Sequence, residues 1–213
     1  MVQKTEKQAN PDTPVRRRGR PRSYKPAQAL QEVTAAFWKQ GYSGTSLDDL
    51  ANATGMNRPS IYAAFGNKRA LYLNALKNYW EAGYVAMREA LAYDKPLPQA
   101  LMQVYERALS IYFPTRGQPL GCFAIGTAVT EAAEDSEIRS TLLTGLRALD
   151  DFFEARIRAA QKSGEVSKKG DAVALAYLAS ATLHTIAIRA RAGAQRPDLE
   201  KLARQAVAVI CAA

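Results

Sequence analysis

Polar side chains at the starts of two short segments form the clearest chemical pattern in the sequence. Thr45 and Ser46 precede the first segment, and Asn57, Arg58 and Ser60 begin the second. Hydroxyls and free backbone N–H groups at a helix N-terminus suit a phosphate oxygen, while arginine and asparagine pair with the edges of guanine and adenine. The same residue types also cap helices, so Ser46 and Asn57 could serve either role or both. Arg58 could equally contact a phosphate instead of a base.

Helical patterns place these polar residues on a unit of three helices that spans residues 25–72. An apolar stripe predicts a first helix over 26–41, with a proline in its first turn and a glycine at its end. A second helix begins at Ser46, and a glycine-containing turn over 54–56 separates it from a third, which Asn57 caps. Two short helices joined by a tight turn are the layout of a helix-turn-helix, whose second helix enters the DNA major groove.

Two stretches within this unit carry a more specific pattern. They read FWKQGYSGTSLDDLA from Phe37 and GMNRPSIYAAFGNKRAL from Gly55. Over about residues 27–73 the chain closely resembles the TetR family of transcriptional regulators. By this resemblance Tyr62 contacts a DNA phosphate, and so does Lys68 at the start of the fourth helix. The alternative for Tyr62 is a mainly structural place in the core.

The resemblance implies an all-α fold with two parts after the arm: a DNA-binding domain over 25–72 and a ligand-sensing and dimerisation domain over 73–213. It further implies a homodimeric regulator, expected to be a repressor, that binds a palindromic double-stranded operator and is released by a small molecule. Dimerisation would use the last two helices. The alternative is an architectural protein that binds A·T-rich DNA without a ligand switch.

Basic residues gather at the N-terminus. The first 25 residues hold eight lysines and arginines against two acidic residues, in a chain whose formal net charge is +9. Arg18 and Arg20 flank Gly19 in an Arg-Gly-Arg-Pro stretch that resembles an AT-hook core. Extended arginines fit a narrow A·T minor groove. Residues 1–24 are therefore predicted to be a disordered arm, which either inserts into that groove or adds salt-dependent affinity without reading sequence.

The remainder of the chain is also predicted to be helical. After a fourth helix that reaches Tyr93, the expected helices span residues 97–113, 121–133, 137–163, 171–192 and 197–211. Aromatic and sulfur-containing side chains on these helices could line a ligand pocket or simply fill a core. A buried phenol needs a hydrogen-bond partner, which a ligand can supply. The candidate ligand-binding residues are Tyr84, Tyr105, Tyr112, Phe123 and His184.

Other residues limit the remaining classes of function. One histidine and two distant cysteines permit no metal site of usual spacing, and no catalytic constellation or glycine-rich phosphate loop is visible, so neither enzyme activity nor a cofactor is expected. Cys122, at a helix start, could be a thiol of lowered pKa that senses oxidants, or a small buried apolar residue. The 17-residue uncharged run Ala172–Ile188 is better explained as a buried helix than as a membrane span. A cytoplasmic, nucleoid-associated protein is expected.

Overall fold

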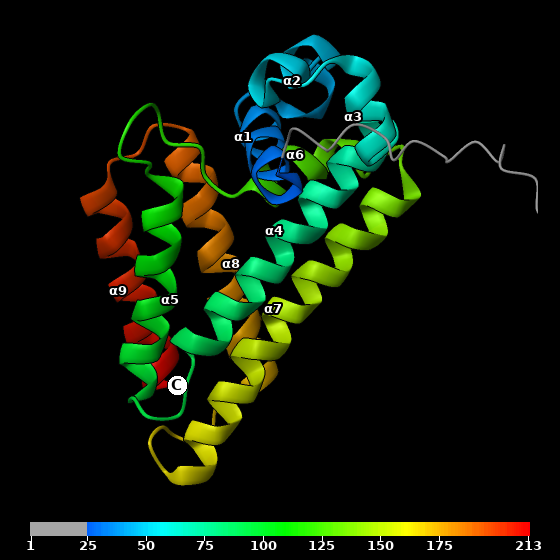
Figure 1. The fold of residues 1–213 in the computed structure, drawn as a ribbon. Helices are drawn as coiled ribbons and strands as arrows, with labels where there is room; N and C mark the ends of the chain where they lie inside the picture. Colours follow the sequence, from blue (N-terminus) through cyan, green and yellow to red (C-terminus); the bar gives the residue numbers. More distant parts are fainter. Residues whose placement is uncertain (1–24) are drawn as a thin grey trace, which may run out of the picture.

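The computed structural model describes residues 25–213, and within that range it contains nine α-helices and no strand (Figure 1). The prediction of an all-α fold is therefore confirmed. The predicted arm, with Arg18 and Arg20, lies outside the described residues. The helices are α1 (Pro26–Gly44), α2 (Leu47–Thr54), α3 (Arg58–Phe65), α4 (Lys68–Ala90), α5 (Leu97–Tyr112), α6 (Phe123–Glu131), α7 (Ser136–Ser163), α8 (Ala172–Arg191) and α9 (Arg196–Ala212).

Local sequence signals fix the three N-terminal helices. Ser46 and Asp49 form a reciprocal capping box at the start of α2: the Ser46 hydroxyl accepts from the Asp49 N–H, and the Asp49 carboxylate accepts from the Ser46 N–H at 2.8 Å. Asn57 and Asn67 cap α3 and α4 with the side-chain oxygen alone, which accepts from the backbone N–H of Ser60 and of Ala70. Gly41, predicted to end the first helix, has a φ of 78° and interrupts it, but one further turn continues to Gly44.

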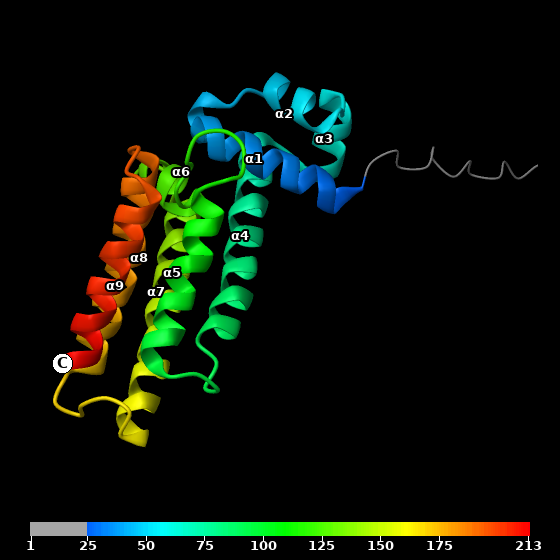
Figure 2. The same cartoon turned by 90° about the vertical axis from the view of Figure 1, so that its left-hand side faces the viewer.

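The long helices form a bundle, and α1 to α3 lie across one end of it (Figures 1 and 2). Helix α4 leaves this N-terminal head and runs down the bundle beside α7, while α5, α8 and α9 pack together on the other side. Helix α4 ends at Ala90, three residues before the predicted end at Tyr93. Short α6 lies between α1 and the bundle and thereby joins the two parts.

Aromatic side chains make this joint a continuous core. The Phe37 ring from α1 meets the Tyr72 ring from α4 edge-on, with 5.2 Å between centroids, and Tyr72 meets Phe123 of α6 at 5.9 Å. All three side chains are buried. The Tyr72 hydroxyl also shares a hydrogen bond of 2.7 Å with the Thr127 hydroxyl of α6. Helix α6 is therefore packed directly against both α1 and α4 in one core.

A polar clamp covers the outside of the same joint. Arg69, in the first turn of α4, makes a two-pronged contact with Asp135, the N-cap of α7, and also reaches Glu137 at 3.1 Å. Lys77 pairs with the same Glu137 at 3.2 Å. This α4–α7 clamp, defined by Arg69, Lys77, Asp135 and Glu137, fixes the start of α4 against the bundle.

Helix α8 is the one described helix that is long and apolar enough to span a membrane by composition. Half of that stretch is buried inside the molecule, where α8 packs against α7, α9 and α5. A helix that is apolar on most sides is expected at the centre of a helical domain. The sequence-based interpretation of this run as a buried helix holds for one half of α8, while residues such as Tyr177 and Ile188 on the other half are exposed.

Candidate DNA-binding surface and ligand cavity

The polar residues of α3 share an exposed face of the head. Asn57 and Arg58 are exposed, Ser60 is half-buried, and the Tyr62 side chain is 47 % exposed although its neighbour Ile61 is buried. The Asn57 amide oxygen accepts from the Ser60 N–H at 2.9 Å, so this residue caps α3 while its remaining amide group faces solvent. Helix α3 thus presents four of the predicted DNA contacts together.

Arg58 is positioned by a neighbouring carboxylate. Its guanidinium makes a two-pronged contact with Asp48 of α2, including Nε to Oδ1 at 2.7 Å, and both side chains are more than half exposed. The bond from Arg58 lowers the pKa of Asp48. Exposed pairs of this kind contribute little to stability, so the arginine can exchange its partner for another acceptor.

The predicted phosphate contacts at helix starts divide into two groups. Ser46 is exposed at the start of α2, and Lys68 is the first residue of α4, where its ammonium lies 4.5 Å from the centre of the Tyr42 ring. Thr45, in contrast, is fully buried and its hydroxyl donates to the Gly41 carbonyl at 2.6 Å. The structure therefore separates Thr45 from the exposed set, because its hydroxyl closes the turn between α1 and α2.

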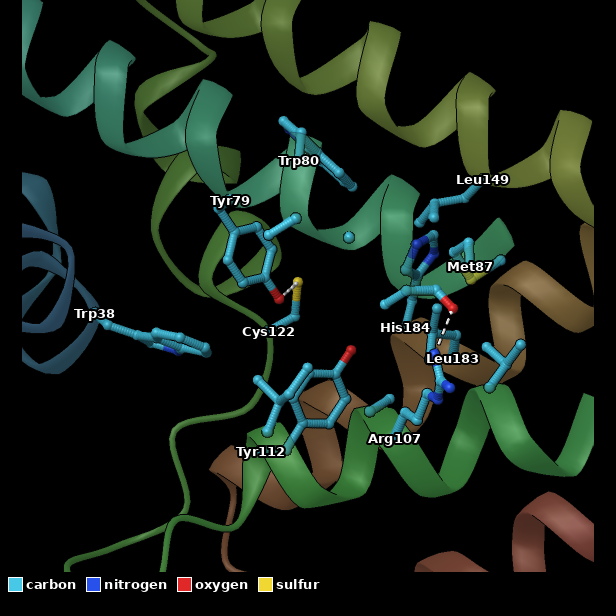
Figure 3. Close-up of a pocket in the computed structure, with 16 residues that line it drawn as sticks. Trp38, Tyr79, Trp80, Met87, Arg107, Tyr112, Cys122, Leu149, Leu183 and His184 are labelled. Carbon is cyan, nitrogen blue, oxygen red and sulfur yellow. Dashed lines mark hydrogen bonds between the residues drawn. The ribbon is translucent and has the colours of Figure 1, made fainter. Parts of the chain in front are cut away.

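A cavity of about 300 Å³ lies in the bundle next to the head (Figure 3). Its walls come from α1, α4, α5, α7, α8 and the segment before α6. Most lining groups are carbon atoms, and few polar atoms reach the space. The lining residues are Trp38, Tyr79, Trp80, Ala82, Gly83, Ala86, Met87, Val104, Arg107, Ala108, Ile111, Tyr112, Cys122, Leu149, Leu183 and His184.

Two of the five predicted ligand-binding residues, Tyr112 and His184, line this cavity. The structure places the other three elsewhere. Tyr84 is only half-buried, where it stacks beside Trp80, and the buried Tyr105 hydroxyl donates to the Ala179 carbonyl at 3.1 Å. Phe123 belongs to the aromatic joint described above. The aromatic character of these three residues thus reflects packing against other parts of the protein and not a place in the cavity wall.

Two aromatic residues of the lining, Trp38 and Tyr79, were not among the ligand-binding residues predicted from the sequence. Their rings meet edge-on at 5.4 Å, and the Tyr79 hydroxyl donates to the Cys122 sulfur at 3.3 Å (Figure 3). Burial is the main cause that raises the pKa of the Cys122 thiol, and it outweighs the N–H groups at the start of α6. The structure thus fits the interpretation of Cys122 as a buried residue better than that of a reactive thiolate.

Charge is almost cancelled in the cavity. Arg107 pairs with Glu89 at 2.8 Å and donates to the Ala86 carbonyl at 3.0 Å. Burial lowers the pKa of His184, so its imidazole is neutral at pH 7. Among residues 25–213 no group of three or more metal-ligating side chains is present. The cavity can therefore hold an apolar molecule but offers no unpaired charge to attract an ion.

Comparison with known proteins identifies both parts of the chain. The family of bacterial regulatory proteins called tetR matches residues 31–75, and the tetracyclin repressor-like C-terminal domain matches residues 98–207. The HTH-type transcriptional repressor ComR of Escherichia coli K12 is 32% identical over 187 residues, which cover 87% of each chain. BdcR, a transcriptional repressor of the same strain, is 31% identical over 107 residues, 50% of this chain and 54% of BdcR.

Solved structures agree with these relatives. A cysteine-substituted form of the TetR family regulator CifR, in complex with a 26-base-pair operator DNA, has a TM-score of 0.81 and 26% identity, and it covers 89% of this chain and 98% of CifR. The exposed helix-turn-helix face, the helical bundle and the matches over both parts lead to one assignment. The chain belongs to the TetR family and is a DNA-binding transcriptional regulator.

Proposed function

We propose that this protein is a repressor that binds a palindromic operator as a homodimer and is released when a small molecule enters the cavity. The observation that carries the proposal is the course of α4. This helix begins at Lys68 beside the exposed face of α3, and farther along it contributes Tyr79 to Met87 to the cavity wall. A ligand that prefers one position of α4 would change the distance between the two α3 helices of a dimer, which are the helices expected to enter the major groove.

An uncovered apolar face supports dimerisation through α8 and α9. Tyr177 and Ile188 of α8 are 58 % and 57 % exposed, and Val209 of α9 is 59 % exposed. Leu178 and Ala181 extend the α8 stripe between them. Exposed apolar patches of this kind mark interaction surfaces, and a two-fold contact would present the two heads to a palindrome.

The relatives support repression and operator binding. ComR and BdcR are both named as repressors, and CifR is described in complex with operator DNA. We propose that Asn57, Arg58 and Ser60 contact bases here, with Arg58 exchanging Asp48 for a guanine edge. Ser46, Tyr62 and Lys68 would contact phosphates, and Arg18 and Arg20 would enter the adjacent minor groove. Such a protein would act in the cytoplasm, associated with the nucleoid.

The test is a fluorescence anisotropy titration with labelled DNA from upstream of the protein's own gene, with scrambled DNA as competitor, at several salt concentrations. Tyr62→Ala is expected to reduce operator affinity at least tenfold, since it removes a phosphate contact and part of the α3 face. Tyr93→Ala is the matched control, because that tyrosine is 72 % exposed beyond the far end of α4. A chain lacking residues 1–24 measures what the arm adds.

Either result is informative. Sequence-dependent binding that Tyr62→Ala abolishes and Tyr93→Ala retains supports the operator-binding regulator. Binding that ignores sequence and survives Tyr62→Ala would instead favour the architectural A·T-rich DNA-binding alternative.

Light scattering of the free protein measures its molar mass and so tests whether it is a dimer. Ile188→Glu on the exposed α8 stripe is expected to shift that mass toward the monomer.

A further inference from the structure

The cavity wall carries few polar groups, and several of them cannot reach a ligand. The indole nitrogens of Trp38 and Trp80 are buried within the wall without a hydrogen-bond partner, and so is the Nε2 atom of His184. The Trp80 ring is packed so closely against α7 that a Cβ on Gly145 would lie 2.1 Å from it. Because the surrounding protein covers these three nitrogens, a molecule in the cavity cannot bond to them.

Two further polar side chains of the wall are already bonded. The Arg107 guanidinium pairs with Glu89 at 2.8 Å and donates to the Ala86 carbonyl at 3.0 Å, so its charge is balanced. The Tyr79 hydroxyl donates to the Cys122 sulfur at 3.3 Å. The side-chain groups left for a ligand are the Tyr112 hydroxyl and the second ring nitrogen of His184.

Tyr112 presents its hydroxyl to the cavity from a fixed place. It is the last residue of α5, and its backbone carbonyl accepts from the Leu120 N–H at 3.0 Å. The side chain points into the cavity on the side of Cys122 (Figure 3). Burial, followed by the neighbouring Cys122, raises the pKa of Tyr112 well above its usual value. The phenol therefore keeps its hydrogen and can donate it.

The Cys122 sulfur is a poor partner for this hydroxyl. A thiol sulfur is a weak acceptor, and this one already accepts from Tyr79. A carbonyl oxygen on a ligand is a stronger acceptor, and a buried donor without a good partner costs free energy. A ligand with such an oxygen would therefore be stabilised at Tyr112.

The second nitrogen of His184 is the rival contact. Burial lowers the pKa of His184, so the imidazole is neutral and this nitrogen carries no charge to offer. The ring also lies within the influence of the Asp150 carboxylate of α7, which acts against the effect of burial. His184 thus has a protein group of strong polarity near it, whereas Tyr112 has only the sulfur. This difference favours Tyr112.

Size and charge restrict what can bind. A volume of about 300 Å³ is at the lower end for ligand pockets, so the occupant is compact. No unpaired charge faces the space, and burying an ion without a partner is costly. The walls are mostly carbon and aromatic, which favours an apolar body with few polar atoms.

We propose that the effector is a compact, uncharged, mainly apolar molecule that carries a hydrogen-bond acceptor such as a carbonyl oxygen, and that the Tyr112 hydroxyl donates to this acceptor. This inference rests on the proposed function of the cavity. Tyr112 adjoins Cys122, the N-cap of α6, so the effector contacts the start of α6 as well as α4. Because α6 packs against α1, effector affinity and DNA affinity are coupled in both directions.

Three probes of similar shape test the ligand class by calorimetry, with the protein as titrant because the hydrocarbon is sparingly soluble. They are 2-acetylnaphthalene, which is neutral with an acceptor, 2-isopropylnaphthalene, which lacks the acceptor, and 2-naphthoate, which is charged. The naphthoate is expected to bind at least roughly tenfold more weakly than the ketone, because its charge would be buried unpaired. The ratio of ketone affinity to hydrocarbon affinity in the wild type is the reference for the variants.

Three variants then locate the donor. Tyr112→Phe keeps the ring but removes the hydroxyl, and should lower the ketone-to-hydrocarbon ratio about fivefold, the value of one ordinary hydrogen bond. Tyr105→Phe is the matched control on the same helix, because that hydroxyl donates to the Ala179 carbonyl away from the cavity, and the ratio should stay. His184→Phe tests the rival and should change both affinities together. Circular dichroism melting confirms that each variant is folded.

Several results would overturn the proposal. They are a ratio that Tyr112→Phe leaves unchanged, a ratio that His184→Phe lowers as much, and a ketone that does not bind the wild type. A naphthoate that binds more tightly than the ketone would also overturn it, since the polar group of the ligand would then be held by Arg107.

The same proteins separate this inference from the proposed function. The anisotropy of labelled upstream DNA is measured with each probe. If both neutral probes release DNA but the ratio does not depend on Tyr112, the ligand-responsive regulator stands and the contact with Tyr112 is refuted. If the ratio depends on Tyr112 but DNA binding is unchanged, the acceptor site stands and release by the ligand is refuted.

Discussion

The DNA-facing surface and the cavity are built in opposite ways. The exposed set on the head comes from one stretch between Ser46 and Lys68, and each helix in it starts at a local cap. The cavity takes its walls from six segments between Trp38 and His184. One is therefore determined by neighbours in sequence and the other by packing between distant helices. Substitutions on the first should change DNA affinity alone, whereas substitutions around the second should change stability as well.

The largest expected effect is at the joint between the two regions. Phe123→Ala removes a fully buried ring that contacts Trp38, Tyr72 and Tyr79. The lost contacts and the space left behind should lower the free energy of unfolding by about 3–5 kcal/mol. Urea unfolding followed by circular dichroism measures this loss.

Tyr62→Ala provides the counterpart on the exposed surface. Its free energy of unfolding should stay within about 0.5 kcal/mol of the wild-type value, although DNA affinity falls. Equal destabilisation by Phe123→Ala and Tyr62→Ala would break the distinction between the two regions.

Two glycines with nearly the same φ differ in what surrounds them in the head and in the bundle. Gly55, in the turn of the head, has a φ of 62°, and Gly121, before α6, has a φ of 65°. A Cβ on Gly55 would meet nothing within 4 Å, but one on Gly121 would lie 2.3 Å from the Ala187 carbonyl oxygen of α8. Gly55→Ala should cost about 1 kcal/mol of strain, and Gly121→Ala about 2–3 kcal/mol because α8 must also move. Thermal unfolding of both variants decides whether close packing matters more in the bundle, and equal losses would show that it does not.

The head was largely predictable from the sequence. Ser46, Asn57 and the turn over 54–56 located α2 and α3 to within a residue, because caps and turns act over three or four positions. Thr45 was the exception. Its residue type suits a phosphate contact, but whether a hydroxyl faces solvent or a neighbouring carbonyl depends on the path of the chain at Gly41.

The bundle was predictable as helices but not as a cavity. Apolar periodicity gave the ranges of α5 to α9 to within two residues, yet it marks only which face of a helix is buried. Tyr105 and Tyr112 lie on the same helix and are both buried, but one bonds to α8 and the other lines the space. Trp38 looked like an ordinary core residue of the first helix. Its contact with the cavity depends on how the head is set on the bundle, which local sequence does not encode.

The polar clamp predicts a specific pH dependence. The hydrogen bonds from Arg69, followed by those from backbone N–H groups of α7, hold the pKa of Asp135 well below its usual range. A carboxylate whose folded pKa is depressed adds stability above its unfolded pKa of about 3.9, and loses it as the pH falls through the folded value. Asp135→Asn should therefore melt below the wild type at pH 7, and the gap should close progressively below about pH 4.

Scanning calorimetry at intervals of about one pH unit between pH 2 and 7 measures this difference in melting temperature between Asp135→Asn and the wild type. Asp151→Asn, which alters an exposed carboxylate farther along α7, is the control and should differ little from the wild type throughout. A gap for Asp135→Asn that is constant with pH would show that the clamp acts through helix capping and not through its charge.

The smallest expected effect has the opposite sign. Gly83 lies inside α4 with ordinary helical φ, it lines the cavity, and a Cβ there would meet nothing within 4 Å. Gly83→Ala should raise the free energy of unfolding by up to about 1 kcal/mol, because alanine favours the helix and loses less chain entropy. Gly83→Leu would extend into the mostly apolar cavity, so binding of a neutral aromatic probe such as 2-acetylnaphthalene, measured by calorimetry, should weaken while operator affinity stays at the wild-type level. If Gly83→Leu instead weakened operator binding without any ligand, the side chain would itself mimic the effector, and the cavity would be linked to the DNA surface more tightly than its separate construction suggests.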